Sequence, residues 1–164
     1  MFHVVLVEPE IPQNAGNIAR TCAATGCTLH MVRPLGFEVS DKYLKRAGLD
    51  YWHLLDVRYY DGIEELFARY PQGRFHYFTT KAPVAYTQAQ FREGDFLVFG
   101  KETKGLPEEL LVNRKKECVR VPMREEARSL NLSNTVAIAV YEGLRQNEFR
   151  GLSSQGELHR LKWE

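Results

Sequence analysis

The chain has 164 residues, 22 of them basic and 21 acidic, so its formal net charge is +1. This length suggests one domain with a core large enough to fold without disulfides or metals, and the charge balance argues against a strongly basic nucleic-acid coat protein while leaving room for a local basic patch. The three cysteines form no CxxC pair, and neither a signal peptide nor a membrane-length apolar run is present, so we expect buried free thiols in a reducing compartment, the cytoplasm.

The predicted secondary structure alternates strands and helices along the chain. Short apolar or β-branched stretches predict strands at residues 2–7, 28–32, 54–59, 74–80, 95–99 and 118–121. Apolar periodicity with capping and stop signals predicts helices at residues 14–25, 40–47, 61–70, 107–112 and 132–149. This order is typical of an α/β fold with a mostly parallel sheet and helices on both faces. We expect one domain over residues 1–150 and a loosely held polar tail at 151–164.

Three loops that follow predicted strands are rich in polar and small residues: 12–17, 100–105 and 122–134. Ligands of open parallel sheets bind beyond the carboxyl ends of the strands, so the last two loops are expected to line one site. No GxGxxG or GxxxxGK[ST] pattern occurs, which weakens dinucleotide and P-loop chemistry, and no GxSxG pattern marks a serine hydrolase. The five histidines are scattered, so a metal site is not expected.

The segment 129–134 (Ser-Leu-Asn-Leu-Ser-Asn) alternates polar and apolar residues just before a mostly apolar helix. Ser and Asn are preferred helix caps, and a cap at Leu132 or Ser133 explains part of this pattern. Two Asn and two Ser exceed what one cap needs, so the segment is also a candidate ligand site with side-chain amides and free backbone N–H groups.

Other single residues keep two interpretations each. Asn14 to Asn17 form either a glycine-assisted turn or a phosphate-binding helix start. Glu102 either stabilises its own loop or hydrogen-bonds a substrate hydroxyl, and Arg20 is either a surface arginine or a group that points toward the same site. Arg124 and Arg128 flank the third loop and would position a phosphate-bearing polymer.

Taken together, the loops resemble the three motifs of the SPOUT (trefoil-knotted) RNA methyltransferases, in order. The matching segments are Asn14-x-Gly16-Asn17-Ile18-x-Arg20, Phe99-Gly100-x-Glu102-x-x-Gly105 and Ser129 to Asn134. Further segments at 8–14, 41–42, 46–51 and 121–123 are similar to the subfamily that methylates the tRNA wobble nucleotide. The resemblance covers residues 2–150, with Lys101 and Lys104 standing where that subfamily usually has proline and often arginine.

The resemblance implies a fold and an activity. It implies a deep trefoil knot in the C-terminal third, an S-adenosylmethionine (SAM) donor without a metal, and methylation of the 2′-hydroxyl of C34 or U34 in leucine tRNAs. It also implies a homodimer with the last helix near the interface, and RNA binding across both chains. Methylation of ribosomal RNA and a non-catalytic RNA-binding module remain the alternatives.

The resemblance also assigns residues to roles. Its cofactor-binding positions are Phe78, Thr79, Gly100, Gly105, Val121, Met123, Ser129, Leu130 and Asn134. Its substrate-binding positions are Asn14, Asn17, Lys42, Arg46, Arg124 and Arg128. Arg20 is the expected catalytic residue; because a guanidinium stays protonated, we expect it to grip the substrate phosphate and ease loss of the hydroxyl proton. Glu102, Asn131 and Tyr141 are the candidates for orienting the nucleotide.

Overall fold

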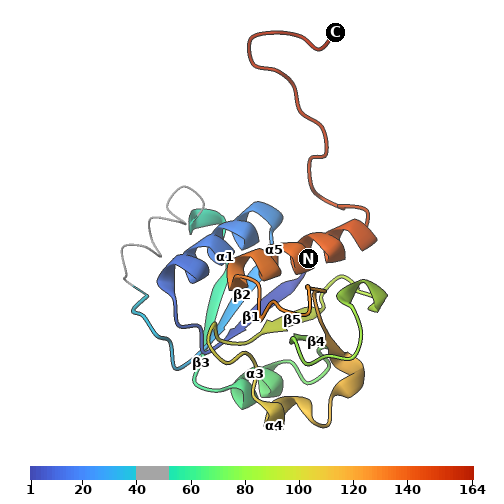
Figure 1. Cartoon of the computed structure of the whole chain (residues 1–164). Helices are drawn as coiled ribbons and strands as arrows, with labels where there is room; N and C mark the ends of the chain where they lie inside the picture. The colour runs from blue at the N-terminus through green and yellow to red at the C-terminus, as the bar shows by residue number, and fades with distance from the viewer. Residues whose placement is uncertain (40–51) are drawn as a thin grey trace.

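A computed structural model describes residues 1–39 and 52–164, and in them a six-stranded parallel sheet forms the centre of the molecule (Figure 1). The strand order is β3-β2-β1-β5-β4-β6. The strands are β1 (His3–Val7), β2 (Thr28–Val32), β3 (Val57–Tyr60), β4 (Phe75–Phe78), β5 (Phe96–Phe99) and β6 (Cys118–Val119). The predicted α/β fold is therefore confirmed.

Helices cover both faces of the sheet. They are α1 (Pro12–Thr25), α3 (Ile63–Arg69), α4 (Glu108–Leu111) and α5 (Leu132–Gln146), with short 3₁₀ helices at Trp52–Leu54, Tyr86–Gln88 and Lys115–Glu117. α1 begins at Pro12, two residues before the predicted start, because proline suits the first helical turn, where its missing N–H has no partner to lose. It ends at Gly26, whose φ of 74° supplies the left-handed stop that the sequence predicted.

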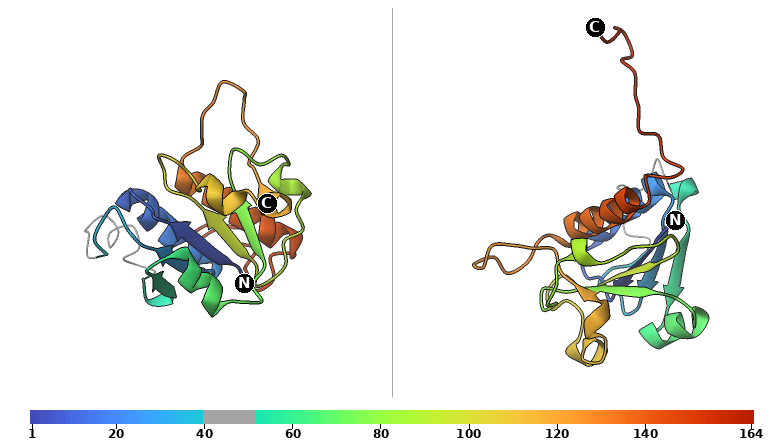
Figure 2. Two further views of the ribbon diagram at one scale, coloured as in Figure 1. Left: turned by 90° about the horizontal axis from the view of Figure 1, so that it is seen from below. Right: turned by 90° about the vertical axis from the view of Figure 1, so that its right-hand side faces the viewer.

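The core has two halves, one on each face of the sheet. Alternate residues of β1 belong to the two halves of the core: Val4 and Leu6 pack toward α1 and α5, whereas Val5 and Val7 pack toward α3 and α4. Figures 1 and 2 show α1 and α5 side by side on one face and α3 and α4 on the other. The three cysteines are buried and free, as predicted, and burial raises the pKa of their thiols.

The order of the strands creates a topological switch point next to β1. From β1 the chain proceeds through β2 to β3 on one side, while β5, β4 and β6 occupy the other side. The carboxyl ends of β1 and β5 are adjacent, so the loops that follow them, 8–11 and 100–105, meet at the edge where such folds bind ligands. Strand order alone does not define how the chain threads, so the trefoil knot stays a prediction.

Several predicted boundaries are wrong. The strand predicted at 54–59 is β3 at Val57–Tyr60, and Leu54 belongs to the preceding 3₁₀ helix. β6 is only two residues long, because Arg120 pairs with Ala85 outside the sheet. α5 ends at Gln146 rather than at 149, and Asn147 is its C-cap. The helix is buried on one side only, and Tyr141 is 49% exposed. The predicted helix at 40–47, with Lys42 and Arg46, lies outside the described residues.

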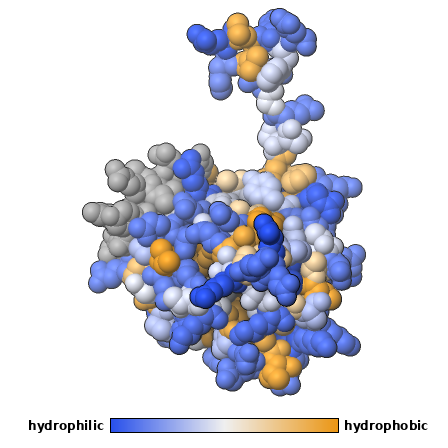
Figure 3. Space-filling model, viewed as in Figure 1, coloured by the Kyte–Doolittle hydropathy of each residue, from blue (hydrophilic) through white to orange (hydrophobic). Residues whose placement is uncertain are grey.

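Two segments stand away from the compact body. The loop 122–131 projects from the edge at which β6 ends, and the tail after residue 151 extends beyond α5 (Figure 2). Figure 3 shows a largely hydrophilic face, with apolar atoms on the tail, where Leu158, Leu161 and Trp163 are exposed. No helix in the described part of the chain is long and apolar enough to cross a membrane.

Candidate functional site

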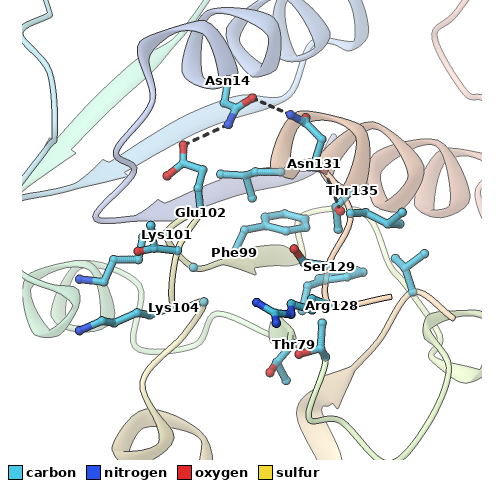
Figure 4. A pocket seen from close by; sticks show the side chains of 18 of the residues that line it. Asn14, Thr79, Phe99, Lys101, Glu102, Lys104, Arg128, Ser129, Asn131 and Thr135 are labelled. Atoms are coloured by element: carbon cyan, nitrogen blue, oxygen red, sulfur yellow. Dashed lines mark hydrogen bonds between the residues drawn. The ribbon is translucent and has the colours of Figure 1, made fainter. Parts of the chain in front are cut away.

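A cavity of about 480 Å³ lies at the carboxyl ends of β1, β4, β5 and β6. Its walls come from all three polar loops, which the sequence spreads over more than a hundred residues (Figure 4). The apolar part of the lining consists of Ile11, Phe78, Phe99, Val121, Met123, Leu130 and Leu132. The volume and the mixed lining are typical of a site for one organic ligand of moderate size.

The loop after β5 is folded tightly against itself. Gly105 has a φ of 66°, and its N–H donates to the carbonyl of Lys101 at 2.9 Å. Gly100 lies directly over this turn: a Cβ atom there would be 2.0 Å from the carbonyl carbon of Gly105 and 2.2 Å from the nitrogen of Leu106. Glycine is therefore required at position 100, and the backbone itself forms this wall of the cavity.

Glu102 ties this loop to the loop that follows β1. Its carboxylate accepts the N–H of Glu10 at 2.7 Å, the N–H of Ile11 at 3.0 Å and the side-chain amide of Asn14 at 3.3 Å. With both carboxylate oxygens occupied, the loop-stabilising interpretation of Glu102 is the one that the geometry supports.

A second acid and a lysine reinforce the same junction. Glu10 accepts the hydroxyl of Thr103 at 2.6 Å, and this hydrogen bond, assisted by the positive charges of Lys101 and Lys104, lowers the pKa of the Glu10 carboxyl. Lys101 also lies 3.8 Å from Glu8. The lysine that replaces the subfamily's usual proline therefore contributes an ion pair between the two loops.

α5 begins at Leu132, as predicted, but its cap is Asn131 and not Leu132 or Ser133. The side-chain oxygen of Asn131 accepts the N–H groups of Ser133 at 2.9 Å and Asn134 at 3.3 Å. These N–H groups are consequently not available to a ligand, contrary to one expectation from the sequence. The Asn131 amide nitrogen donates to the side-chain oxygen of Asn14 at 3.1 Å, which connects the first and third loops.

Most of the predicted site residues meet at this cavity. The lining includes Asn14, Phe78, Thr79, Gly100, Glu102, Gly105, Val121, Met123, Arg128, Ser129, Leu130 and Asn131. The second and third loops, which were predicted to line one site, both line this cavity.

Five described candidates lie outside the cavity: Asn17, Arg20, Arg124, Asn134 and Tyr141. Arg20 is exposed on α1, because six residues after Asn14 a helical side chain points about 120° away from it around the axis. Arg124 lies on the projecting loop, 3.8 Å from Glu126. The backbone of Asn134 is engaged by the cap, and Tyr141 lies further along α5.

Three lysines at the cavity were missed as site residues. Lys81, Lys101 and Lys104 line it, and Figure 4 shows Lys101 and Lys104 at one edge, with Arg128 on the side of Ser129 and Thr79. Lys81 lies 3.5 Å from Glu108. The position of these lysines in loops after β4 and β5 was the signal that could have identified them. In the described part of the chain, no group of three or more His, Cys, Asp or Glu side chains could hold a metal ion.

Comparison with known proteins identifies the class. Residues 1–141 match the SpoU rRNA Methylase family, and the chain belongs to this family. A Bacillus subtilis (strain 168) protein provisionally named a tRNA (cytidine(34)-2′-O)-methyltransferase is 56% identical over 154 residues, which cover 92% of this chain and 96% of that protein. A solved structure on the 2-OH methylation of C/U34 on tRNA is 48% identical, with a TM-score of 0.87, and covers 92% of this chain and 98% of that one.

The fold also occurs in more distant methyltransferases. The SpoU methyltransferase AviRb from Streptomyces viridochromogenes, in complex with the cofactor AdoMet, has a TM-score of 0.78 at 24% identity, with 89% of this chain and 57% of that chain covered. At this identity the likeness concerns the fold alone.

Proposed function

We propose that the protein transfers a methyl group from SAM to the 2′-hydroxyl of the wobble nucleotide, C34 or U34, of leucine tRNAs in the cytoplasm. The observation that carries the proposal is the single cavity that all three motif loops form at the switch point of the sheet. The Bacillus subtilis relative and the C/U34 structure support the choice of tRNA position, since each is similar to this chain over most of its length.

The cavity fits the proposed donor. Its volume of about 480 Å³ falls within the range for ligands of this size, and its apolar side chains suit an adenine ring and a methionine stem. The backbone of Gly100 and Gly105 forms a wall that no side chain occupies, as a closely held ligand requires. We propose that Phe78, Thr79, Val121, Met123, Ser129 and Leu130 complete this pocket. SAM supplies an electrophilic methyl group when it is bound.

The chain's own residues then have to place a ribose beside that pocket. Holding the reactants in line contributes up to roughly 7–11 kcal/mol in favourable cases, so positioning is the main task. In this proposal Asn14 and Asn131 lie at the ribose, and Arg128 contacts the RNA backbone. Arg20 binds a phosphate, and its fixed positive charge favours loss of the hydroxyl proton.

We further propose that the protein works as a homodimer. One chain offers a small surface for an anticodon stem-loop, and Arg20 does not line the cavity of its own chain. A second copy would add its basic groups to one continuous tRNA surface, with the exposed side of α5 at the contact. Sedimentation at micromolar concentration is expected to give a dimer, and a monomer would contradict this part of the proposal.

The proposed reaction is tested with radiolabelled SAM and two matched anticodon stem-loops of a leucine tRNA, one with ribose and one with 2′-deoxyribose at position 34. We expect label to enter the first and not the second. Ribosomal RNA is offered in a parallel reaction. If it is labelled and neither stem-loop is, the rRNA alternative is correct; if no RNA is labelled, the proposal is overturned. Arg20→Ala is expected to abolish transfer while S-adenosylhomocysteine (SAH) still binds; transfer near the wild-type rate would contradict the role of Arg20.

A further inference from the structure

A continuous chain of hydrogen bonds crosses the cavity wall from the loop after β5 to the start of α5. Glu102 accepts the amide N–H of Asn14, and Asn14 accepts the amide N–H of Asn131 (Figure 4). Asn131 in turn accepts two backbone N–H groups of α5. All three side chains line the cavity, so these hydrogen bonds lie at the surface that a ligand would contact. Asn14, at the centre, is only 7% exposed.

The two ends of this series of hydrogen bonds, Glu102 and the first N–H groups of α5, fix which atom of each amide faces which neighbour. A carboxylate that already holds backbone N–H groups is an acceptor only, so Asn14 must turn its nitrogen toward Glu102. A backbone N–H is a donor only, so Asn131 must turn its oxygen toward α5. Both requirements leave the Asn14 oxygen facing the Asn131 nitrogen, at 3.1 Å, without conflict. The orientation of both amides therefore follows from chemistry at the ends.

This orientation determines what the cavity wall can offer a ligand. The Asn131 oxygen is occupied by the cap, and one of its two amide N–H groups is donated to Asn14. The remaining polar group of the Asn131 side chain is its second N–H, which is a donor. A ligand atom at this point of the wall must therefore be an acceptor.

We infer that Glu102 acts as a positioning residue, which works through Asn14 to fix the Asn131 amide so that it donates an N–H to the acceptor ribose oxygen. The inference rests on the proposed function for the identity of that oxygen. It removes Glu102 from the candidates for direct contact with the nucleotide, because both its oxygens already accept N–H groups. Asn131 keeps its expected place at the nucleotide.

Glu102→Gln tests the series of hydrogen bonds at the end that the Glu102 carboxylate forms. Glutamine offers one acceptor oxygen and one NH₂. In either orientation the NH₂ faces a donor, the N–H of Glu10 or the N–H groups of Ile11 and Asn14, so the side chain is displaced and the acceptor that fixes the Asn14 amide is lost. The Asn14 amide can then turn, which changes its contact with the Asn131 nitrogen. Glu8→Gln is the matched control, because Glu8 also joins the same two loops, through Lys101, but lies outside the hydrogen-bonded chain.

The direct readout is the NMR signal of the Asn131 side-chain amide, which Glu102 does not touch. We expect Glu102→Gln to shift this signal and Glu8→Gln to leave it in place. An Asn131 signal unchanged in Glu102→Gln would overturn the inference. This readout needs no RNA, so it separates failure of the inference from failure of the proposed function, which the wild-type transfer assay reports.

Kinetics supply the second readout. Glu102→Gln is expected to lower kcat at least tenfold, toward the loss typical of one preorganised donor, while KM for SAM stays within about threefold. Because Glu102→Gln weakens a loop junction and could unfold it, Asn131→Ser is the second variant: serine keeps a preferred cap but removes the amide N–H. Asn131→Ser should still fold, with a melting temperature lowered only by loss of the contact with Asn14, and lose at least tenfold in kcat; wild-type kcat in this variant would overturn the inference.

Discussion

Gly100 provides the sharpest mutational test of the cavity, because the space that a side chain would need there is filled by backbone. The Cβ of an alanine would lie 2.0 Å from the carbonyl carbon of Gly105, whereas ordinary contact begins at 3.4 Å. The turn at Gly105 and Leu106 would therefore have to move by about 1.4 Å, the difference between these distances. No rotation of a flexible side chain can relieve the clash.

Two consequences follow for Gly100→Ala. Overpacking of this kind costs at least about 2 kcal/mol, which lowers the melting temperature of a protein of this size by roughly 4–8 °C. A displacement of more than 1 Å in a wall of the cavity should also weaken binding of SAH at least tenfold, since ligand contacts depend on distances of a few tenths of an ångström. Thermal unfolding and isothermal titration calorimetry with SAH measure the two effects.

Gly94→Ala is the matched control. Gly94 also has a positive φ, of 87°, but a Cβ there meets no atom within 4 Å, and the residue does not line the cavity. We expect a loss of about 1–2 kcal/mol from backbone strain alone, with SAH affinity unchanged. Binding of SAH by Gly100→Ala as tight as that by Gly94→Ala would show that the close packing of this loop does not form the binding site.

Two further predictions concern the tail and the histidines. Truncation after Leu152, which still packs on the core, should leave the melting temperature within about 2 °C and methyl transfer unchanged, because residues 153–164 extend from the body; a larger loss would show that the tail belongs to the domain. Burial chiefly, then the charge of Arg58, lowers the pKa of His3; burial chiefly, then His3 and Arg58, lowers the pKa of His30 to about 3. Both histidines therefore bind protons more weakly in the folded chain than in the unfolded one. Stability is therefore complete above about pH 6.5 and falls as the pH drops toward 3; the urea midpoint should decrease between pH 7.5 and 5.0, and an unchanged midpoint would contradict the assignment.

The elements that local sequence determines were predicted well. The apolar run at 28–32 is a strand with those bounds, and Gly26 ends α1 with the expected left-handed φ. Strands and helices in alternation led directly to the parallel sheet, because a crossover between parallel strands requires a helix or a long loop. Local periodicity carries this information without reference to the rest of the chain.

The cavity depends instead on contacts between distant residues. Asn14 and Asn131 are 117 positions apart, and Glu102 meets the loop after β1 across about 90 positions. Several residues at 129–134 are equally good caps by type, so the choice of Asn131 was decided by its partners and not by propensity. The motifs indicated which loops matter, but the division between residues that line the cavity and residues that hold it together required the structure.

A cavity that serves 2′-O-methylation of the tRNA wobble nucleotide leaves its product in the nucleosides of the cell's own tRNA. Leucine tRNAs are isolated from the parent strain, from a strain without the gene and from that strain with the gene restored, and position 34 is analysed by mass spectrometry. We expect a 2′-O-methylated pyrimidine at position 34 that disappears with the gene and returns with the wild-type copy but not with Arg20→Ala. A methylated wobble nucleotide that persists without the gene, beside a ribosomal RNA that loses a 2′-O-methyl group, would overturn the proposed function.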